Sequence, residues 1–366
     1  MAGRQAHPGM LVLLRESRGL TQVEVSSAMT KASPLGATGV SQGYVSRAES
    51  GRLTVGDGRL EWYAAALGYP EGLLCLDPQL GGVGVGLIHH RKKAALSAPA
   101  LRQVHAQLAL TRIQLSGIAS AAKTSRGTGS AFLRVPLDTL TTPKDAAREV
   151  RKAWKLAPGP VPNVIEAVEK AGALVTVRDL GSDLLDAVSQ WDGVEPPLFL
   201  VNGRAPGDRC RFSVAHELGH LIMHAEPGSG PQQEKQADSF AAELLMPAAD
   251  IRNAFKAGVD LQRLMELKRT WRVSMSALLR RALDLNALTE WQHRTLVIEM
   301  SALGYRTAEP VEIPREQPRT VPALVRTLLD EHGLTLESAA TCARLLPEDF
   351  QHLYVEGHRT SPLPSH

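Results

Sequence analysis

The segment that most constrains this chain is an apolar run, Phe212–Met223, that contains two histidines four residues apart. On a helix this spacing puts the rings of His216 and His220 on one face, where their nitrogens can bind one metal ion. Glu217 follows the first histidine and can hold a water molecule beside that metal. A catalytic zinc takes three protein ligands and keeps one position open. The pattern therefore favours a zinc hydrolase, although a motif with only three fixed positions also occurs by chance.

A third ligand is expected on the next helical segment, fourteen residues beyond the second histidine. The residues after Glu234 show the apolar spacing of a helix. Glu234 can complete a His2Glu site, and Asp238, one turn further on, can accept the second ring N–H of a ligating histidine. The alternative for this pair is an exposed acidic helix face. Glu243 is the second choice as ligand, but it lies nearly opposite Glu234 on the helix, so only one of them can bind the metal.

Three segments of the chain carry a family likeness, namely residues 147–172, 211–224 and 234–247. They resemble the ImmA/IrrE family of metallopeptidases. The resemblance implies a zincin-like domain with His216, His220 and Glu234 as Zn²⁺ ligands and Glu217 as general base. Mn²⁺ can use the same ligands. It also implies a substrate, a helix-turn-helix repressor whose cleavage induces stress-response or mobile-element genes.

The expected mechanism follows from the chemistry of such sites. Zinc lowers the pKa of bound water toward about 7. Glu217 would take a proton as water attacks a peptide carbonyl and then deliver it to the leaving amine. His224 is one candidate for stabilising the oxyanion, because it continues the row of histidines. That row drifts by about 40° per step on a helix of 3.6 residues per turn, so a structural role is favoured for His224.

The amino-terminal region, residues 8–76, is expected to form a bundle of short helices. Thr21 and Glu24 make a capping box at the start of one helix. Ser41 can cap the next helix, expected at 42–50. Two short helices joined by a Gly-containing turn are typical of a helix-turn-helix that places its second helix in the major groove of DNA.

The residues of these two helices resemble the XRE repressor-type DNA-binding family. Leu14–Gln22 and Val40–Gly51 carry the likeness, and Arg15 and Glu49 match the internal ion pair of that family. An insertion of about seven residues within 31–38 departs from the family and should loop out. The alternatives are a helical bundle that binds protein and a domain of this type that has lost its DNA binding. The expected contacts to double-stranded DNA are with phosphates for Gln22 and Ser41, and with bases for Gln42, Gly43, Ser46 and Arg47.

Composition narrows the class of protein further. The chain has 366 residues, of which 43% are hydrophobic and 4% aromatic, so two or three cores built from Leu, Val and Ala are expected. Its three cysteines are far apart, which argues against a disulfide framework or a Cys-rich metal site and favours a cytoplasmic protein. The sequence contains no long apolar run and no signal peptide, so we expect no membrane contact.

The expected fold class is mainly α with a small β-sheet (α+β). Helices are expected at 144–155, 162–171, 211–224 and 233–246, and strands at 173–177 and 197–201. The second strand is expected to border the cleft, where a free edge can bind substrate backbone. The domains expected are a helix-turn-helix domain (1–77), a Gly-rich linker and basic helical connector (78–135), a metallopeptidase domain (136–250), its helical extension (251–305), and a Pro-rich linker with a small helical end (306–366).

The connector is unusual because it contains eight Lys and Arg residues and no acidic residue between Asp77 and Asp138. Gly81–Gly86 predicts a flexible linker. The following stretch, 92–122, is expected to be mostly helical. It is interpreted either as a solvated connector or as an additional set of phosphate contacts.

Two functions remain open from the sequence. In the first, a zinc endopeptidase that also binds DNA cleaves a separate repressor or its own linker near 78–95. In the second, the chain is a transcriptional regulator whose peptidase-like domain senses a ligand or a metal without hydrolysis. The intact Glu217 favours the first. A homodimer is expected from the palindromic operators that such DNA-binding domains use.

Overall fold

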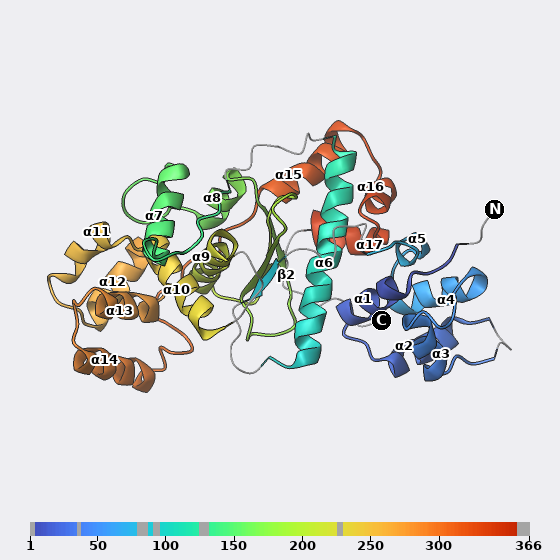
Figure 1. Cartoon of the computed structure of the whole chain (residues 1–366), viewed down its shortest axis with the longest axis horizontal. Helices are drawn as coiled ribbons and strands as arrows, with labels where there is room; N and C mark the ends of the chain where they lie inside the picture. The colour runs from blue at the N-terminus through green and yellow to red at the C-terminus, as the bar shows by residue number, and fades with distance from the viewer. Residues whose placement is uncertain are drawn as a thin grey trace.

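The protein is mainly helical and is built around one small sheet, as the sequence predicts. The computed structural model describes residues 4–34, 38–78, 87–90, 96–123, 132–224 and 230–356. Of residues 87–90 only the backbone is described, and the predicted Gly-rich linker at 81–86 lies outside the described residues. Helices occupy both ends of the molecule, and the sheet lies between them (Figure 1).

Among the described residues, the central sheet has four strands, and its two inner strands are buried on both faces. In spatial order the strands are β1 (Leu87–His90), β3 (Ala187–Trp191), β4 (Leu198–Asn202) and β2 (Leu174–Arg178). β2 and β4 run parallel, whereas β3 is antiparallel to both β4 and β1. Side chains alternate along a strand, so Leu198 and Leu200 of β4 join one hydrophobic core, while Phe199 and Val201 join the other.

Two of the four strands were predictable. The expected strands at 173–177 and 197–201 correspond to β2 and β4, each shifted by one residue. The expectation that 197–201 forms a free edge beside the cleft is wrong, because β4 lies between β3 and β2. A strand with a neighbour on each side has no unpaired backbone groups to offer a substrate. The strand nearest the candidate site is β3, which the sequence does not predict.

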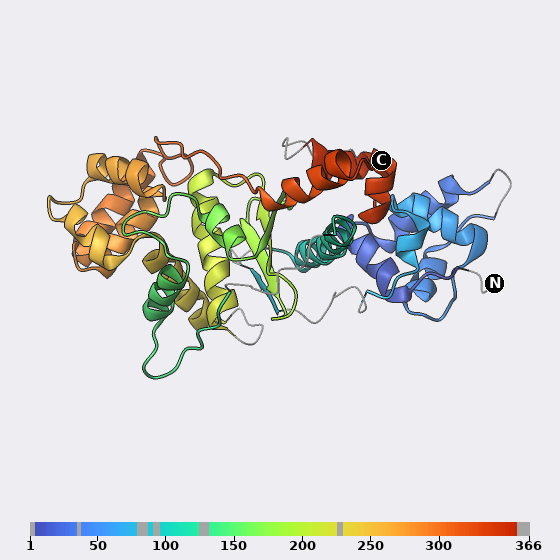
Figure 2. The same cartoon turned by 90° about the horizontal axis from the view of Figure 1, so that it is seen from above.

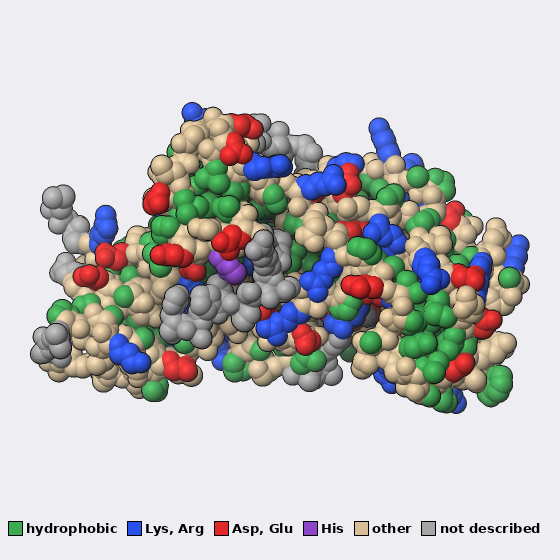
Figure 3. All heavy atoms as spheres, turned by 180° about the vertical axis from the view of Figure 1, so that it is seen from behind, with side chains coloured by type: hydrophobic (Ala, Val, Ile, Leu, Met, Phe, Trp, Pro, Cys, Tyr) green, Lys and Arg blue, Asp and Glu red, His purple; other side chains and the backbone are tan. Residues whose placement is uncertain are grey.

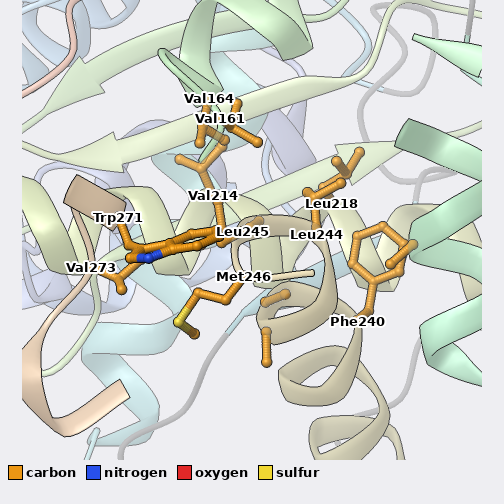
Figure 4. Close-up of a cluster of buried hydrophobic side chains, with 14 of the residues drawn as sticks. Val161, Val164, Val214, Leu218, Phe240, Leu244, Leu245, Met246, Trp271 and Val273 are labelled. Atoms are coloured by element: carbon orange, nitrogen blue, oxygen red, sulfur yellow. The ribbon is translucent and has the colours of Figure 1, made fainter. Parts of the chain in front are cut away.

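One face of the sheet carries the helices that hold the candidate site. They are α7 (Pro143–Ala153), α8 (Val164–Lys170), α9 (Gly207–Met223) and α10 (Pro231–Leu245). All four were predicted, but α9 begins four residues earlier than expected, with Asp208 in its first turn. An acidic side chain there interacts favourably with the helix dipole. Val214 and Leu218 of α9 lie in one buried cluster with Phe240 and Leu244 of α10 (Figure 4).

The helices after α10 extend this core rather than forming a separate one. They are α11 (Ala248–Ile251), the short helix η1 (Arg252–Phe255), α12 (Leu261–Trp271), α13 (Met275–Asp284) and α14 (Glu290–Ala302). Leu278 and Leu279 are buried in the core that contains α9 and α10, as predicted. Trp271 and Val273 lie beside Met246 in the same cluster (Figure 4).

The other face of the sheet is covered by α6 (Ala98–Ala121). This helix begins later than the expected 92, and neither interpretation of it as a connector is correct for its buried part. Leu108 and Leu115 are buried, and the Arg112 guanidinium donates to the Pro196 and Gln190 carbonyl oxygens at 2.5 and 3.0 Å. Within the described part of the chain, neither α6 nor any other helix is long and apolar enough to cross a membrane.

The carboxyl-terminal helices pack beside α6 and reach the amino-terminal helices (Figure 2). Phe350 is fully buried among them, and Arg18 forms an ion pair with Asp349 at 2.8 Å. Gly117 of α6 lies directly against the Cys342 carbonyl, where a side chain has no room. These elements are α15 (Thr320–Arg326), η2 (Thr327–Glu331), α16 (Leu336–Cys342), α17 (Pro347–Phe350) and η3 (Gln351–Val355).

Residues 306–319, which we call the strap, connect these helices to α14. The sequence predicts a Pro-rich linker here, but the charged side chains of the strap fix it to the core formed by α7 to α14. Glu309 binds Lys268 at 2.5 Å, and Glu316 binds Arg211. Both Glu316 and Arg211 are almost completely buried. The same Glu316 carboxylate accepts backbone N–H groups at the start of α8.

The amino-terminal bundle consists of α1 (Pro8–Ser17), α2 (Gln22–Ala32), α3 (Gln42–Glu49), α4 (Asp57–Leu67) and α5 (Glu71–Leu74). The predicted capping box of Thr21 and Glu24 is present, and Ser41 caps α3. Arg15 and Glu49 form the expected ion pair at 2.6 Å. Helix α2 extends into the predicted loop as far as Ala32, and residues 35–37 of that loop lie outside the described residues.

Candidate functional site

The three expected metal ligands lie together between α9 and α10. The Nε2 atoms of His216 and His220 are 3.1 Å apart. The two carboxylate oxygens of Glu234 lie 3.3 Å from Nε2 of His216 and 3.4 Å from Nε2 of His220. One ligand atom from each residue falls within 4.8 Å of the others. The histidines are buried and Glu234 is partly exposed, so solvent reaches the cluster from the side of α10.

Gly219 explains how the two helices come close enough to share these ligands. It lies between the two histidines, on the side of α9 that faces α10. A Cβ at this position would lie 2.9–3.2 Å from atoms of the Phe240 side chain. Real Cβ atoms almost never come that close to a neighbour. The glycine therefore lets Phe240 pack directly on the α9 backbone.

The hydrogen bonds behind the histidines turn both ligand nitrogens toward one point. Nδ1 of His216 lies 2.9 Å from an Asp238 carboxylate oxygen, so it carries the hydrogen and leaves a lone pair on Nε2. Nδ1 of His220 lies 2.9 Å from Nδ1 of His224, whose Nε2 lies 3.0 Å from the Gln236 side-chain oxygen. If that oxygen accepts from His224, then His224 accepts from His220, and Nε2 of His220 also presents a lone pair.

This donor set fits a zinc ion. Two facing imidazole lone pairs 3.1 Å apart, with a carboxylate beside them, match a tetrahedral site with metal–nitrogen distances of about 2.0–2.1 Å. Partners behind each histidine are the rule at such sites, because they fix the orientation of the ring. His216, His220 and Glu234 would hold the ion, and Asp238 is placed as the sequence predicts.

Glu217 lies at the buried end of the cluster with one oxygen to spare. Its side chain is fully buried, and its Oε2 accepts a hydrogen bond of 2.8 Å from the Ser189 hydroxyl on β3. Its Oε1 has no hydrogen-bond partner among the described residues. Burial raises the pKa of this carboxyl, an effect that the neighbouring histidines partly offset. A buried carboxylate oxygen without a protein partner is well suited to hold a water molecule.

The electrostatics of the cluster, taken without a cation, follow from its geometry. Burial alone would lower the pKa of His216, but hydrogen bonds to Asp238 and Glu234 outweigh it and raise that pKa to about 9. His216 and His220 hold the pKa of Glu234 well below its usual range, although burial alone would raise it. Burial, together with the nearby His220, lowers the pKa of His224 to about 4, so this ring is neutral at pH 7.

Two alternatives from the sequence can now be placed. Glu243, the second choice as ligand, is buried at the far end of α10, where it binds Arg281 and Arg148. His224 faces the back of His220, so its ring supports a ligand, in line with the favoured structural role. Sequence reasoning missed Ser189 and Gln236. Gln236 lies two residues before Asp238 on the predicted helix, and that position was the only signal for it.

The predicted DNA contacts lie around the start of α3. Ser41, Gln42 and Arg47 are exposed there, whereas Gly43, Ser46 and Gln22 are partly buried. The Gln42 side-chain amide donates to Gln22 at 2.7 Å, and Gln22 in turn donates to Glu49 at 2.9 Å. The two glutamines therefore form one linked pair rather than two independent contacts. On the face seen in Figure 3, basic and acidic side chains are interspersed.

Comparison with known proteins agrees with the geometry of the metal cluster. Residues 168–283, roughly a third of the chain, match the Peptidase_M78 family model, described as the IrrE N-terminal-like domain. The matched region extends from α8 to α13 and contains every residue of the cluster, including Ser189, Glu217 and Gln236. No curated protein matches the chain.

Proposed function

We propose, from this IrrE-like metallopeptidase domain, that the protein is a zinc-dependent endopeptidase fused to a DNA-binding domain. The observation that carries the proposal is the combination of three ligands with a general base. His216, His220 and Glu234 converge on one point, and beside them Oε1 of Glu217 has no hydrogen-bond partner in the described part of the chain. A purely structural metal site needs a fourth ligand and has no use for such a carboxylate.

The residues divide the work of peptide hydrolysis between them. The zinc ion would polarise a peptide carbonyl and lower the pKa of water. Glu217 would hold the attacking water through Oε1, take its proton, and deliver it to the leaving amine. Ser189 keeps the carboxylate in place through Oε2. Burial raises the pKa of Glu217, which makes the carboxylate a stronger base toward water.

The amino-terminal bundle is proposed to bind double-stranded DNA through α3, as a homodimer in the cytoplasm. The exposure of Gln42 and Arg47 supports this, and so does the Arg15–Glu49 pair that the XRE-type resemblance implies. The substrate proposed from the family resemblance is a helix-turn-helix repressor, whose cleavage would control stress-response or mobile-element genes.

The experiment that tests the enzyme combines metal content with cleavage. We expect about one zinc per purified chain, lost in His216→Ala and Glu234→Ala. Glu217→Gln should keep the zinc but produce no new peptide termini when incubated with a defined peptide mixture and analysed by mass spectrometry. The matched control is Glu299→Gln, an exposed glutamate of α14, which should behave as the unaltered chain does.

The outcomes separate the two functions left open by the sequence. Zinc-dependent cleavage that disappears in Glu217→Gln supports the endopeptidase. Zinc bound by the same three ligands without any cleavage would favour a regulator that senses a ligand or a metal. A chain that takes up no zinc even when it is supplied would contradict both the metal site and the peptidase.

A further inference from the structure

In the sequence, β1 comes between the amino-terminal bundle and α6, but in space it belongs to the central sheet. It pairs antiparallel with β3, although about a hundred residues separate the two strands in sequence. β3 is bonded to β4 on its other side, so β1 occupies the only remaining edge of β3. If β1 were removed, β3 would be an edge strand with unpaired backbone groups beside the metal cluster.

The register brings β1 to the catalytic residues. His89 lies opposite Ser189 in the antiparallel ladder, and Ile88 lies opposite Gln190. Ser189 is the residue whose hydroxyl holds Glu217 at 2.8 Å. β1 also contacts α9, the helix that carries both histidines. The backbone of residues 87–90 is therefore separated from Glu217, the proposed general base, only by β3.

An extended peptide can bind to a protein by adding a strand to a free sheet edge. The main-chain hydrogen bonds give such binding its affinity without demanding a particular sequence. We propose that the edge of β3 is the peptide-binding edge of this site, and that residues 87–90 occupy it as a substrate-like strand. The proposal deepens the peptidase function and rests on it for the meaning of the bound strand.

The tether makes this occupation effective even if the strand binds weakly. β1 and β3 belong to one chain, and a short intramolecular connection supplies a bound segment at an effective concentration in the millimolar range. A separate peptide of equal intrinsic affinity competes poorly with it at micromolar concentration. In this arrangement β1 blocks the edge of β3 to other peptides until β1 dissociates from it.

The test compares two changes in β1. The double variant Ile88→Pro/His89→Pro removes the backbone N–H donors of both residues. Because successive residues of a strand point their N–H groups to opposite sides, one of these two donors must face β3. Ile88→Ala with His89→Ala is the matched control, since it changes the same side chains but keeps both donors. Each pair is made in the full-length Glu217→Gln chain, so that bound peptide is not hydrolysed.

The probe is a fluorescent synthetic peptide with the sequence of residues 84–93, and the measurement is its affinity by fluorescence anisotropy. We expect the proline pair to bind it at least about tenfold more tightly than the alanine pair or the chain with β1 intact. Equal affinity for all three proteins would overturn the proposal. So would the absence of binding to any of them, because the freed edge would then not accept a peptide.

This result is independent of the proposed activity. The readout is binding, measured in a chain that cannot use Glu217 as a base. A protein that takes up zinc and cleaves peptides but shows no effect of the proline pair would keep the proposed function and lose the inference. A protein that gains peptide affinity but never hydrolyses would keep the inference as a peptide-binding edge and lose the enzyme.

Discussion

Single residues decide how closely α9 and α10 approach, and Gly219 is the clearest case. Its missing side chain lets Phe240 pack on the helix backbone between the two ligating histidines. A glycine inside a helix costs roughly 1 kcal/mol relative to alanine. Its presence in the middle of α9 is therefore explained by packing rather than by helix stability.

We predict that Gly219→Ala destabilises the protein, although alanine is the better helix former. The added methyl group would lie 2.9 Å from Phe240, so the free energy of unfolding should fall by about 1–3 kcal/mol. Urea unfolding measures it. Gly58→Ala is the control, because a Cβ there meets no atom within 4 Å. If Gly219→Ala is as stable as that control, the close packing of α10 on α9 is incorrect.

His224 is expected to act on the metal only through its neighbour. His224→Ala removes the group behind His220 while leaving all three ligands in place. We predict a zinc affinity about 10- to 100-fold lower, the usual cost of losing such a partner. Competition with a chromophoric chelator measures it, with His332→Ala at an exposed position as the control. Unchanged affinity would show that the His220 ring is oriented without His224.

At the scale of single residues, the sequence predicts those site residues whose positions depend on spacing along one helix. The four-residue interval of His216 and His220, and the helix that carries Glu234 and Asp238, set the site within two neighbouring helices. Ser189 could not be found in this way. It comes from a strand that pairs with distant segments, and nothing in its local sequence shows that its hydroxyl meets Glu217.

Whole elements were harder to predict, and the strap shows why. Its prolines predict a linker, but composition does not reveal where its acidic side chains go. Glu309 forms an ion pair with the buried side chain of Lys268, and Glu316 forms one with the buried side chain of Arg211. α6 is a similar case. Its apolar residues lie on all sides, a pattern that indicates a buried helix rather than a solvated connector.

We predict that the strap contributes strongly to stability through one ion pair. Glu316→Ala leaves Arg211 buried without its partner, and removing one member of a buried pair costs about 3–5 kcal/mol. The environment of Arg211 is already unfavourable for charge, because burial lowers its pKa to about 9. Chemical unfolding measures the change. Glu312→Ala, at an exposed position of the same strap, should change stability little, and a similar loss in both variants would contradict the role of the pair.

For the whole molecule, the sheet divides two hydrophobic cores. One contains α7 to α14 and one face of the sheet, and includes the metal site. The other contains the amino-terminal bundle, α6, the carboxyl-terminal helices and the opposite face. The amino-terminal and carboxyl-terminal helices therefore share one core. Local sequence patterns cannot predict this contact, because the residues in contact are more than three hundred positions apart.

Because of this shared core, we predict that a defect in the carboxyl-terminal helices reaches the amino-terminal bundle. Phe350→Ala should cost about 3–5 kcal/mol and raise amide exchange in α1, α6 and α16 together. Hydrogen-exchange mass spectrometry measures it. Leu278→Ala, in the other core, should instead raise exchange in α12 and α13. If Phe350→Ala loosened only the helices around it, the two ends of the chain would be independent units. If it loosens α1 as well, any event that moves the carboxyl-terminal helices also acts on the proposed DNA-binding surface.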